Sequence, residues 1–113
     1  MLSSTVAMAE DTAVRQFEPC RACHSLDPAR RGLPGPNLAG LIGRKVGGDG
    51  AFDYSPVLIK ARDEGLVWDE TRLDAFRADP AEMFPGLWMA IRGIGEAAER
   101  RALVRLLADP SSR

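Results

Sequence analysis

The sequence predicts a small all-α domain, in which short helices are joined by long loops. Its 113 residues fit a single domain. Four segments have helical periodicity, and none has the alternating pattern of a strand. The largest loop, residues 32–50, is rich in Gly. A long ordered loop in so small a domain needs something to wrap around, and a prosthetic group would also add burial that the small core lacks.

The first and last helices are expected at residues 11–18 and 95–108. The first places Val14 and Phe17 three residues apart on one face and leads into a cysteine pair. The last is expected to end at Pro110. Its buried stripe is expected to consist of Leu103, Leu106 and Leu107.

Two further helices are predicted by their end signals. Ser55 and Pro56 suit the N-cap and first helical position of one helix, which Gly65 ends. Asp69 suits the N-cap of the next, which stops near Pro80. The apolar residues of the two helices are Val57, Leu58 and Ala61 in the first and Leu73 and Phe76 in the second.

The charge pattern excludes some classes of partner. The 15 basic and 16 acidic residues nearly cancel, giving a formal net charge of −1. No basic block is present, which argues against nucleic acid as a partner. Lys45 and Lys60 are the only lysines, so a Lys-rich docking face is not available. No apolar run is long enough to span a membrane.

The first residues resemble the tail of a secretory signal peptide. Ala7, Met8 and Ala9 fit a small-x-small cleavage site, and Glu10 would be the first mature residue. No positively charged segment precedes them and the apolar part is short, so an ordinary disordered N-terminus is the alternative. We expect residues 1–9 to be a signal-peptide remnant, residues 10–113 to form the domain, and the protein to be exported to the periplasm.

The strongest motif is Cys-x-x-Cys-His, at Cys20, Cys23 and His24. This pattern is typical of covalent c-type haem attachment. Two thiols about one helical turn apart can add to the two vinyl groups on one porphyrin edge, and the histidine can then ligate the iron. The alternatives are a dithiol redox pair, which lacks its usual βαβ context, a zinc site, which lacks a fourth ligand, and a simple disulfide.

The second iron ligand can be narrowed by counting. His24 is the only histidine, so ligation by two histidines of one chain is excluded. Methionine with histidine is a standard pair for electron-transfer haem. The methionines are Met1, Met8, Met83 and Met89. Spacing alone does not choose between Met83 and Met89, and either could instead fill the core.

Taken together, these residues resemble the class I cytochrome c family, in its bacterial, mitochondrial-like branch. The similarity runs over about residues 12–108 and identifies residues 10–113 as a cytochrome c domain. Besides Cys20 to His24, the segments that carry it are 35–45 (Gly-Pro-Asn-Leu-Ala-Gly-Leu-Ile-Gly-Arg-Lys), Tyr54-Ser55-Pro56, Gly65-Leu66-Val67-Trp68, Leu73-Asp74-Ala75-Phe76, Asp79-Pro80, and Pro85-Gly86-Leu87-Trp88-Met89.

The resemblance implies particular roles for residues of the haem site. Met89 would be the distal iron ligand, since it follows Pro85 and Gly86 at the family's spacing. The carbonyl of Pro36 would accept a hydrogen bond from His24 and fix its tautomer. The residues that would reach a buried haem propionate are Arg44, Tyr54 and Trp68. Trp68 could alternatively be plain core packing. The first and last helices would cross, with Phe17 and Leu106 at the contact.

Four positions depart from the family's usual haem lining. Phe76 replaces a frequent Tyr, so a hydrogen bond near the methionine sulfur would be absent. Arg77 replaces an apolar residue, and either its charge extends outward or the alignment slips locally. Leu87 replaces a propionate-binding polar residue. Trp88 replaces a polar residue or Lys, and would either be exposed near the haem edge or fold back over the loop.

The predicted function is electron transfer by one haem c, covalently bound through Cys20 and Cys23, with iron cycling between ferric and ferrous states on His24 and Met89. We expect an electron carrier rather than an enzyme, in a periplasmic respiratory or photosynthetic chain. It would be a monomer that docks redox proteins at the exposed haem edge. The rival classes are a haem peroxidase or gas-binding protein, and a zinc or dithiol module.

Overall fold

The computed structural model describes residues 11–109, and its regular elements are helical. Residues 11–17 are helical and continue into a short 3-10 turn. The elements that follow along the chain are η1 (Glu18–Cys20), α2 (Pro56–Asp63), α3 (Glu70–Ala78), α4 (Pro80–Met83) and α5 (Ala97–Ala108). Among residues 11–109, β pairing is limited to one isolated bridge between Lys45 and Val67. The all-α prediction is confirmed.

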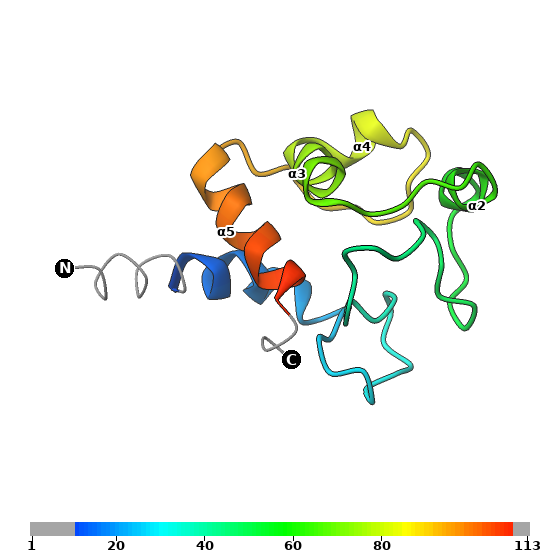
Figure 1. Ribbon diagram of the computed structural model, residues 1–113, viewed down its shortest axis with the longest axis horizontal. Helices are drawn as coiled ribbons and strands as arrows, with labels where there is room; N and C mark the ends of the chain where they lie inside the picture. Colours follow the sequence, from blue (N-terminus) through cyan, green and yellow to red (C-terminus); the bar gives the residue numbers. More distant parts are fainter. Residues whose placement is uncertain (1–10, 110–113) are drawn as a thin grey trace.

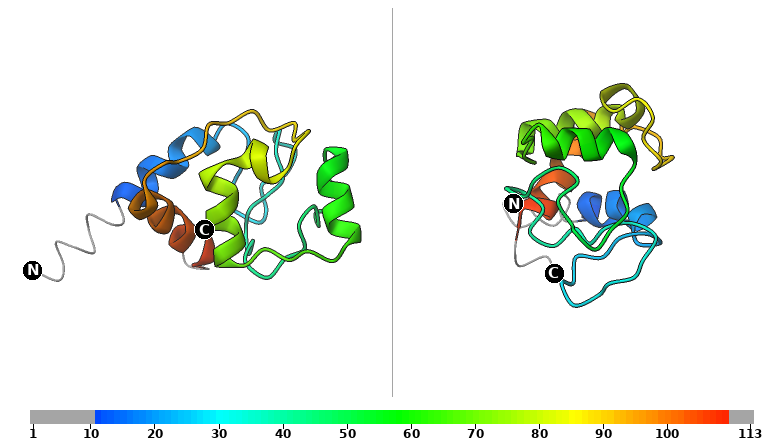
Figure 2. Two further views of the ribbon diagram at one scale, coloured as in Figure 1. Left: turned by 90° about the horizontal axis from the view of Figure 1, so that it is seen from above. Right: turned by 90° about the vertical axis from the view of Figure 1, so that its right-hand side faces the viewer.

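The helices lie around long connecting segments. Residues 11–17 and α5 lie side by side at one end of the molecule, and α2 lies at the other end (Figure 1). α3 packs against both α4 and α5. Figure 2 shows from two further sides how residues 21–55 loop out between the N-terminal helix and α2. The ends of the chain, residues 1–10 and 110–113, lie outside the described part, and with them Pro110, Met1, Met8 and the expected signal-peptide remnant.

The ends of α2 and α3 agree with their sequence signals. Pro56 is the first residue of α2, and the carbonyl of Ser55 accepts hydrogen bonds from the next turn. Gly65 follows α2 with a φ of 79°, a conformation that glycine adopts without a Cβ penalty. At the start of α3, Asp69 Oδ1 accepts a hydrogen bond of 2.6 Å from the backbone N–H of Arg72. Short-range chemistry therefore sets these ends.

Pro80 begins a helix as well as following one. The backbone turns at Asp79, and α4 starts directly afterwards with Pro80 at its first position. Oδ1 of Asp79 accepts a hydrogen bond of 3.2 Å from the N–H of Glu82, so this residue caps α4. The sequence analysis did not predict α4, because four residues are too few to show a helical period.

The buried face of the first helix differs from the predicted one. Phe17 is 1% exposed, but Val14 is 47% exposed and Ala13 is buried instead. The face that packs inward thus contains Ala13 and Phe17, which are four residues apart, rather than Val14 and Phe17, which are three apart. Both spacings place two residues on one face of a helix, so the sequence alone does not decide between them. Pairing Val14 with Phe17 was therefore wrong.

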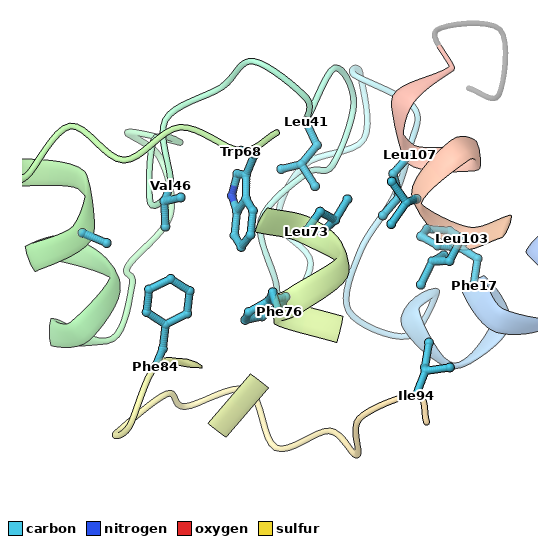
Figure 3. Close-up of a cluster of buried hydrophobic side chains, with 12 residues drawn as sticks. Phe17, Leu41, Val46, Trp68, Leu73, Phe76, Phe84, Ile94, Leu103 and Leu107 are labelled. Carbon is cyan, nitrogen blue, oxygen red and sulfur yellow. The ribbon is translucent and has the colours of Figure 1, made fainter. Parts of the chain in front are cut away.

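The contact of the first and last helices is centred on Leu103. This side chain is 1% exposed and belongs to the same buried cluster as Phe17 and Leu107, and Figure 3 shows it beside Phe17. Val104 is also buried. Leu106 is only partly buried at the edge of the cluster. The predicted crossing is present, but Leu103 takes the central position that was assigned to Leu106.

Three aromatic rings form a second part of the core. The Trp68 ring centroid lies 5.1 Å from that of Phe76 and 6.4 Å from that of Phe84, both in edge-to-face arrangements. The Phe76 and Phe84 centroids are 5.8 Å apart. Leu73 lies between this aromatic cluster and the Leu103 cluster (Figure 3). α3 therefore joins the two parts of the core through Leu73 and Phe76.

We predict that Leu103→Ala lowers the free energy of unfolding by about 2–5 kcal/mol, because it leaves a cavity at the helix crossing. Leu106→Ala, a change of equal size on the same helix, should cost clearly less. Guanidinium unfolding curves of the two variants measure both effects. A loss for Leu106→Ala equal to that for Leu103→Ala would contradict this description of the contact.

Candidate cofactor site

The cysteine motif forms a single tight turn that begins at Cys20, the last residue of η1. The N–H groups of Cys23 and His24 donate to the carbonyl of Cys20 over 3.0 and 2.8 Å. Both thiols are free and partly buried. Burial raises the pKa of the Cys20 thiol, and the nearby charge of Arg77 offsets part of that rise. The turn thus holds two thiols and an imidazole on one short piece of backbone.

The imidazole of His24 is held by the segment that contains Gly35 and Pro36. Its Nδ1 lies 2.7 Å from the carbonyl oxygen of Pro36. A carbonyl can only accept a hydrogen bond, so Nδ1 carries the proton and the lone pair is on Nε2. Burial lowers the pKa of His24, while the bond to Pro36 raises it and the charge of Arg77 lowers it further. The ring is therefore neutral and oriented as a metal ligand requires.

Gly35 lies against this ring at a distance that permits no side chain. A Cβ on Gly35 would lie 2.5 Å from Cε1 and 2.8 Å from Nδ1 of His24. The N–H of Gly35 donates to the carbonyl of Cys23 over 2.8 Å. The backbone of one segment thus packs directly on the imidazole of the other, and only glycine allows that approach.

Asn37 holds the loop behind this contact. Its Nδ2 donates to the carbonyls of Asp27 and Arg30 over 2.7 and 3.0 Å. Its Oδ1 accepts from the N–H of Ala39 over 2.9 Å. The side chain is 7% exposed, so these bonds satisfy a buried amide and fix residues 27–39 as a unit. Sequence analysis placed Asn37 in a family segment but gave it no role.

Arg44, Tyr54 and Trp68 gather at one place. Nη1 of Arg44 donates to the carbonyls of Asn37 and Ala39 over 2.8 and 3.0 Å, and the carbonyl of Arg44 accepts from the N–H of Trp68 over 2.8 Å. Within residues 11–109, the ion pairs do not include Arg44. Its positive charge thus acts on Tyr54 and has no carboxylate partner in this part of the chain.

Tyr54 keeps its hydroxyl proton at neutral pH. Burial raises the pKa of Tyr54, and this effect outweighs the hydrogen bond with Asp49 and the charge of Arg44, which both lower the pKa. The Oη atom accepts a hydrogen bond of 3.0 Å from the N–H of Asp49. The hydroxyl proton remains available to donate to another acceptor.

The segment that contains Met89 is fastened at both ends. Before it, the N–H of Leu87 donates to the carbonyl of Phe84, closing a turn in which Pro85 and Gly86 are central and Gly86 has a φ of 93°. Proline followed by a positive-φ glycine is the pattern of a type II turn. Met89 itself is partly buried and lies near His24, whereas Met83 is the last residue of α4.

After Met89 the chain returns to α3. The N–H of Ile94 donates to the carbonyl of Arg77 over 2.8 Å. Gly93 lies so close to the carbonyl of Ala78 that a Cβ would collide with it. Residues 84–94 thus form a strap with its start at the end of α4 and its end on the last turn of α3.

The unusual positions have definite placements. Phe76 is buried among aromatic rings, and Leu87 packs against the core. Arg77 is 6% exposed, which excludes the alternative in which its charge extends outward. Trp88 is 62% exposed. The alternative in which it folds back over its loop is therefore excluded.

Two other kinds of site are absent from residues 11–109. In this part of the chain no group of three or more His, Cys, Asp or Glu side chains could hold a metal ion. No helix there has the length and apolar character of a membrane span.

Comparison with known proteins identifies the family. A cytochrome c2 from Agrobacterium tumefaciens is 40% identical over 96 residues, which cover 85% of this chain and 86% of the relative. Cytochrome c2 iso-2 from Magnetospirillum molischianum is 38% identical over 91 residues, which cover 80% of this chain and 90% of the relative. The chain belongs to the class I c-type cytochromes. No protein-family model matches it.

The fold agrees with this assignment. The structure of cytochrome cH from Methylobacterium extorquens superposes with a TM-score of 0.71 at 35% identity, covering 89% of this chain and 95% of that one. The protein is thus an electron carrier, not an enzyme, and its cofactor is one covalent haem c. Its two cysteines, Cys20 and Cys23, both lie in the motif turn. The assignment of a covalent haem c excludes the alternatives of a dithiol redox pair and a zinc site.

The residues in the site fit a haem. Both thiols lie on one turn with a neutral imidazole whose Nε2 is the unprotonated nitrogen. Apolar side chains from separate segments lie partly exposed against the core, among them Leu26, Leu38 and Met89. A large flat apolar ligand needs such a surface on several sides. Sequence analysis missed the close approach of Gly35, which Gly-Pro after a histidine-containing turn could have suggested.

We predict that Gly35→Ala displaces the His24 ring and lengthens its bond to Pro36, because the added Cβ has no room. The free energy of unfolding of the haem-loaded protein should fall by about 1–3 kcal/mol. Gly95→Ala is the matched control, since nothing lies within 4 Å of a Cβ there. Ring-proton NMR of His24 and denaturant titration measure the two effects. Equal stability of both variants would contradict the described contact.

Proposed function

We propose that the protein carries one electron at a time on a haem iron ligated by His24 and Met89. The observation that carries this proposal is the 2.7 Å contact of His24 Nδ1 with the Pro36 carbonyl. It leaves Nε2 unprotonated and holds the ring, so binding iron needs neither proton loss nor reorientation. Cys20 and Cys23 form the thioether bonds. When bound, haem c supplies the ferric–ferrous couple, and no substrate bond is made or broken.

Met89 is the proposed distal ligand. It lies near His24, and it is partly buried against the core. The turn at Pro85 and Gly86 and the bond of Ile94 to Arg77 fix the strap on either side of it. Met83 is instead part of α4, whose cap at Asp79 fixes its backbone. A thioether ligand favours the ferrous state and raises the reduction potential.

Arg44, Tyr54 and Trp68 are proposed to bind a haem propionate. Arg44 has a positive charge with no carboxylate partner within residues 11–109, and Tyr54 retains a hydroxyl proton to donate. Charge and donors are thus already gathered where a partly buried carboxylate would need them. Trp68 contributes its indole N–H in addition to packing on Phe76.

We further propose that the protein works as a monomer in a periplasmic respiratory or photosynthetic chain. The small-x-small pattern at Ala7, Met8 and Ala9 supports export. Redox proteins would dock at the haem edge beside Met89, where Trp88 offers an exposed indole. Large aromatic side chains are common at the centres of protein interfaces.

Met89→Ala should abolish the far-red sulfur-to-iron absorption band of the ferric protein, because the thioether ligand is removed. The matched control is Met83→Ala, which should keep the band. Haem should survive acid–acetone extraction in the native protein and in both variants, since the thioether bonds at Cys20 and Cys23 are unaffected. Loss of the band in Met83→Ala with retention in Met89→Ala would assign the ligand to the other methionine. Native peroxidase activity as high as that of Met89→Ala would argue for an open iron position instead.

Electron exchange should depend only weakly on ionic strength. The formal net charge of the polypeptide is −1, so long-range attraction or repulsion between docking proteins is small. NMR line broadening in mixtures of ferric and ferrous protein gives the self-exchange rate at several salt concentrations, and stopped-flow mixing gives the rate with a redox partner. If the rate of electron transfer to the redox partner falls steeply as the salt concentration rises, docking is steered by charge and this prediction is wrong.

A further inference from the structure

Arg77 is a buried cation with unsatisfied hydrogen-bonding groups. Its side chain lies on the last turn of α3 and is 6% exposed. Its Nε and Nη1 atoms are buried, and neither has a hydrogen-bond partner among residues 11–109. Burial lowers the pKa of the guanidinium, but arginine stays protonated in proteins. The ion pairs among residues 11–109 do not include Arg77 either. A positive charge is therefore largely buried in this part of the chain without a carboxylate partner.

The surroundings of Arg77 place this charge at the thioether side of the haem site. The ionisable groups on which it acts are Cys20 and His24. Vinyl groups and propionates lie on opposite edges of the porphyrin, so a charge close to Cys20 lies away from the propionates. Arg44, by contrast, acts on Tyr54. Arg77 and Arg44 thus act on different ionisable groups of the site.

We propose that Arg77 raises the reduction potential of the haem as an uncompensated buried charge. This inference rests on the proposed function, because it requires a haem attached at Cys20. Reduction adds one electron to the iron, and a nearby positive charge stabilises the ferrous state relative to the ferric state. Inside a protein such an interaction is screened far less than at the surface.

The effect of the charge can be separated from folding. The side chain makes no hydrogen bond through Nε or Nη1 that a substitution would break. The backbone carbonyl of Arg77, which accepts from Ile94, is kept by any residue at this position. A neutral unbranched side chain of similar length should therefore be accommodated, and it removes the cost of burying a charge.

The test compares reduction potentials of the haem-loaded protein and three variants by spectroelectrochemical titration. Arg77→Met should lower the ferrous-to-ferric ratio at fixed ambient potential about tenfold, which is about 59 mV for one electron. Arg77→Lys keeps the charge, so its ferrous-to-ferric ratio should stay close to that of the native protein. Arg101→Met is the matched control, because it removes the charge of an exposed arginine on α5 and should change the ratio less than twofold.

Each result supports or overturns the inference. A ratio unchanged in Arg77→Met, or lowered equally in Arg77→Lys, would overturn it. If Arg77→Met does not load haem, Arg77→Gln replaces it. Failure of both neutral variants beside a normal Arg77→Lys would also overturn it, since the charge would then serve folding. Absence of the far-red band or of the thioether bonds in the native protein would instead refute the proposed function.

Discussion

The contact between two backbone segments across the His24 ring is the constraint on which the site depends. The turn at Cys20–His24 supplies the imidazole, and the segment at Gly35 and Pro36 presses on it from the side and binds its Nδ1. The bonds of Asn37 hold that second segment in place. The same loop extends to Arg44, whose guanidinium binds loop carbonyls. One ordered loop thus fixes the orientation of the ring and the position of the guanidinium that is proposed to bind a haem propionate.

In the second half of the chain, α3 has the corresponding central role. Its inward face supplies Leu73 and Phe76 to the two parts of the core, and its last turn carries Arg77 and receives the strap that contains Met89. The two halves therefore act differently. One holds the His24 imidazole by hydrogen bonds, and the other holds the aromatic core, a buried charge and the strap that contains Met89.

The family resemblance implied long-range features such as the helix crossing and the bond of His24 to Pro36, but the features predicted from the residues themselves are those set within a few residues. The cysteine motif and the helix ends at Pro56 and Asp69 depend on local chemistry. What the sequence could not predict depends on packing between distant segments. Whether Ala13 or Val14 faces inward is a small helix rotation that Leu103 decides. Four residues of α4 show no period. Arg77 lies four residues after Leu73, on the apolar side of α3, but arginine is a residue type that is seldom buried.

The strap has a consequence for which molecules can reach the iron. It begins with a turn at Phe84–Leu87, and at its other end Ile94 is hydrogen-bonded to Arg77 of α3 while Gly93 packs closely against the carbonyl of Ala78. With Met89 as ligand, moving the sulfur aside would require breaking one of these attachments. Dissolved oxygen and peroxide would then find no vacant coordination position. The tied strap would keep electrons from leaking to small oxidants and reserve them for proteins that dock at the haem edge.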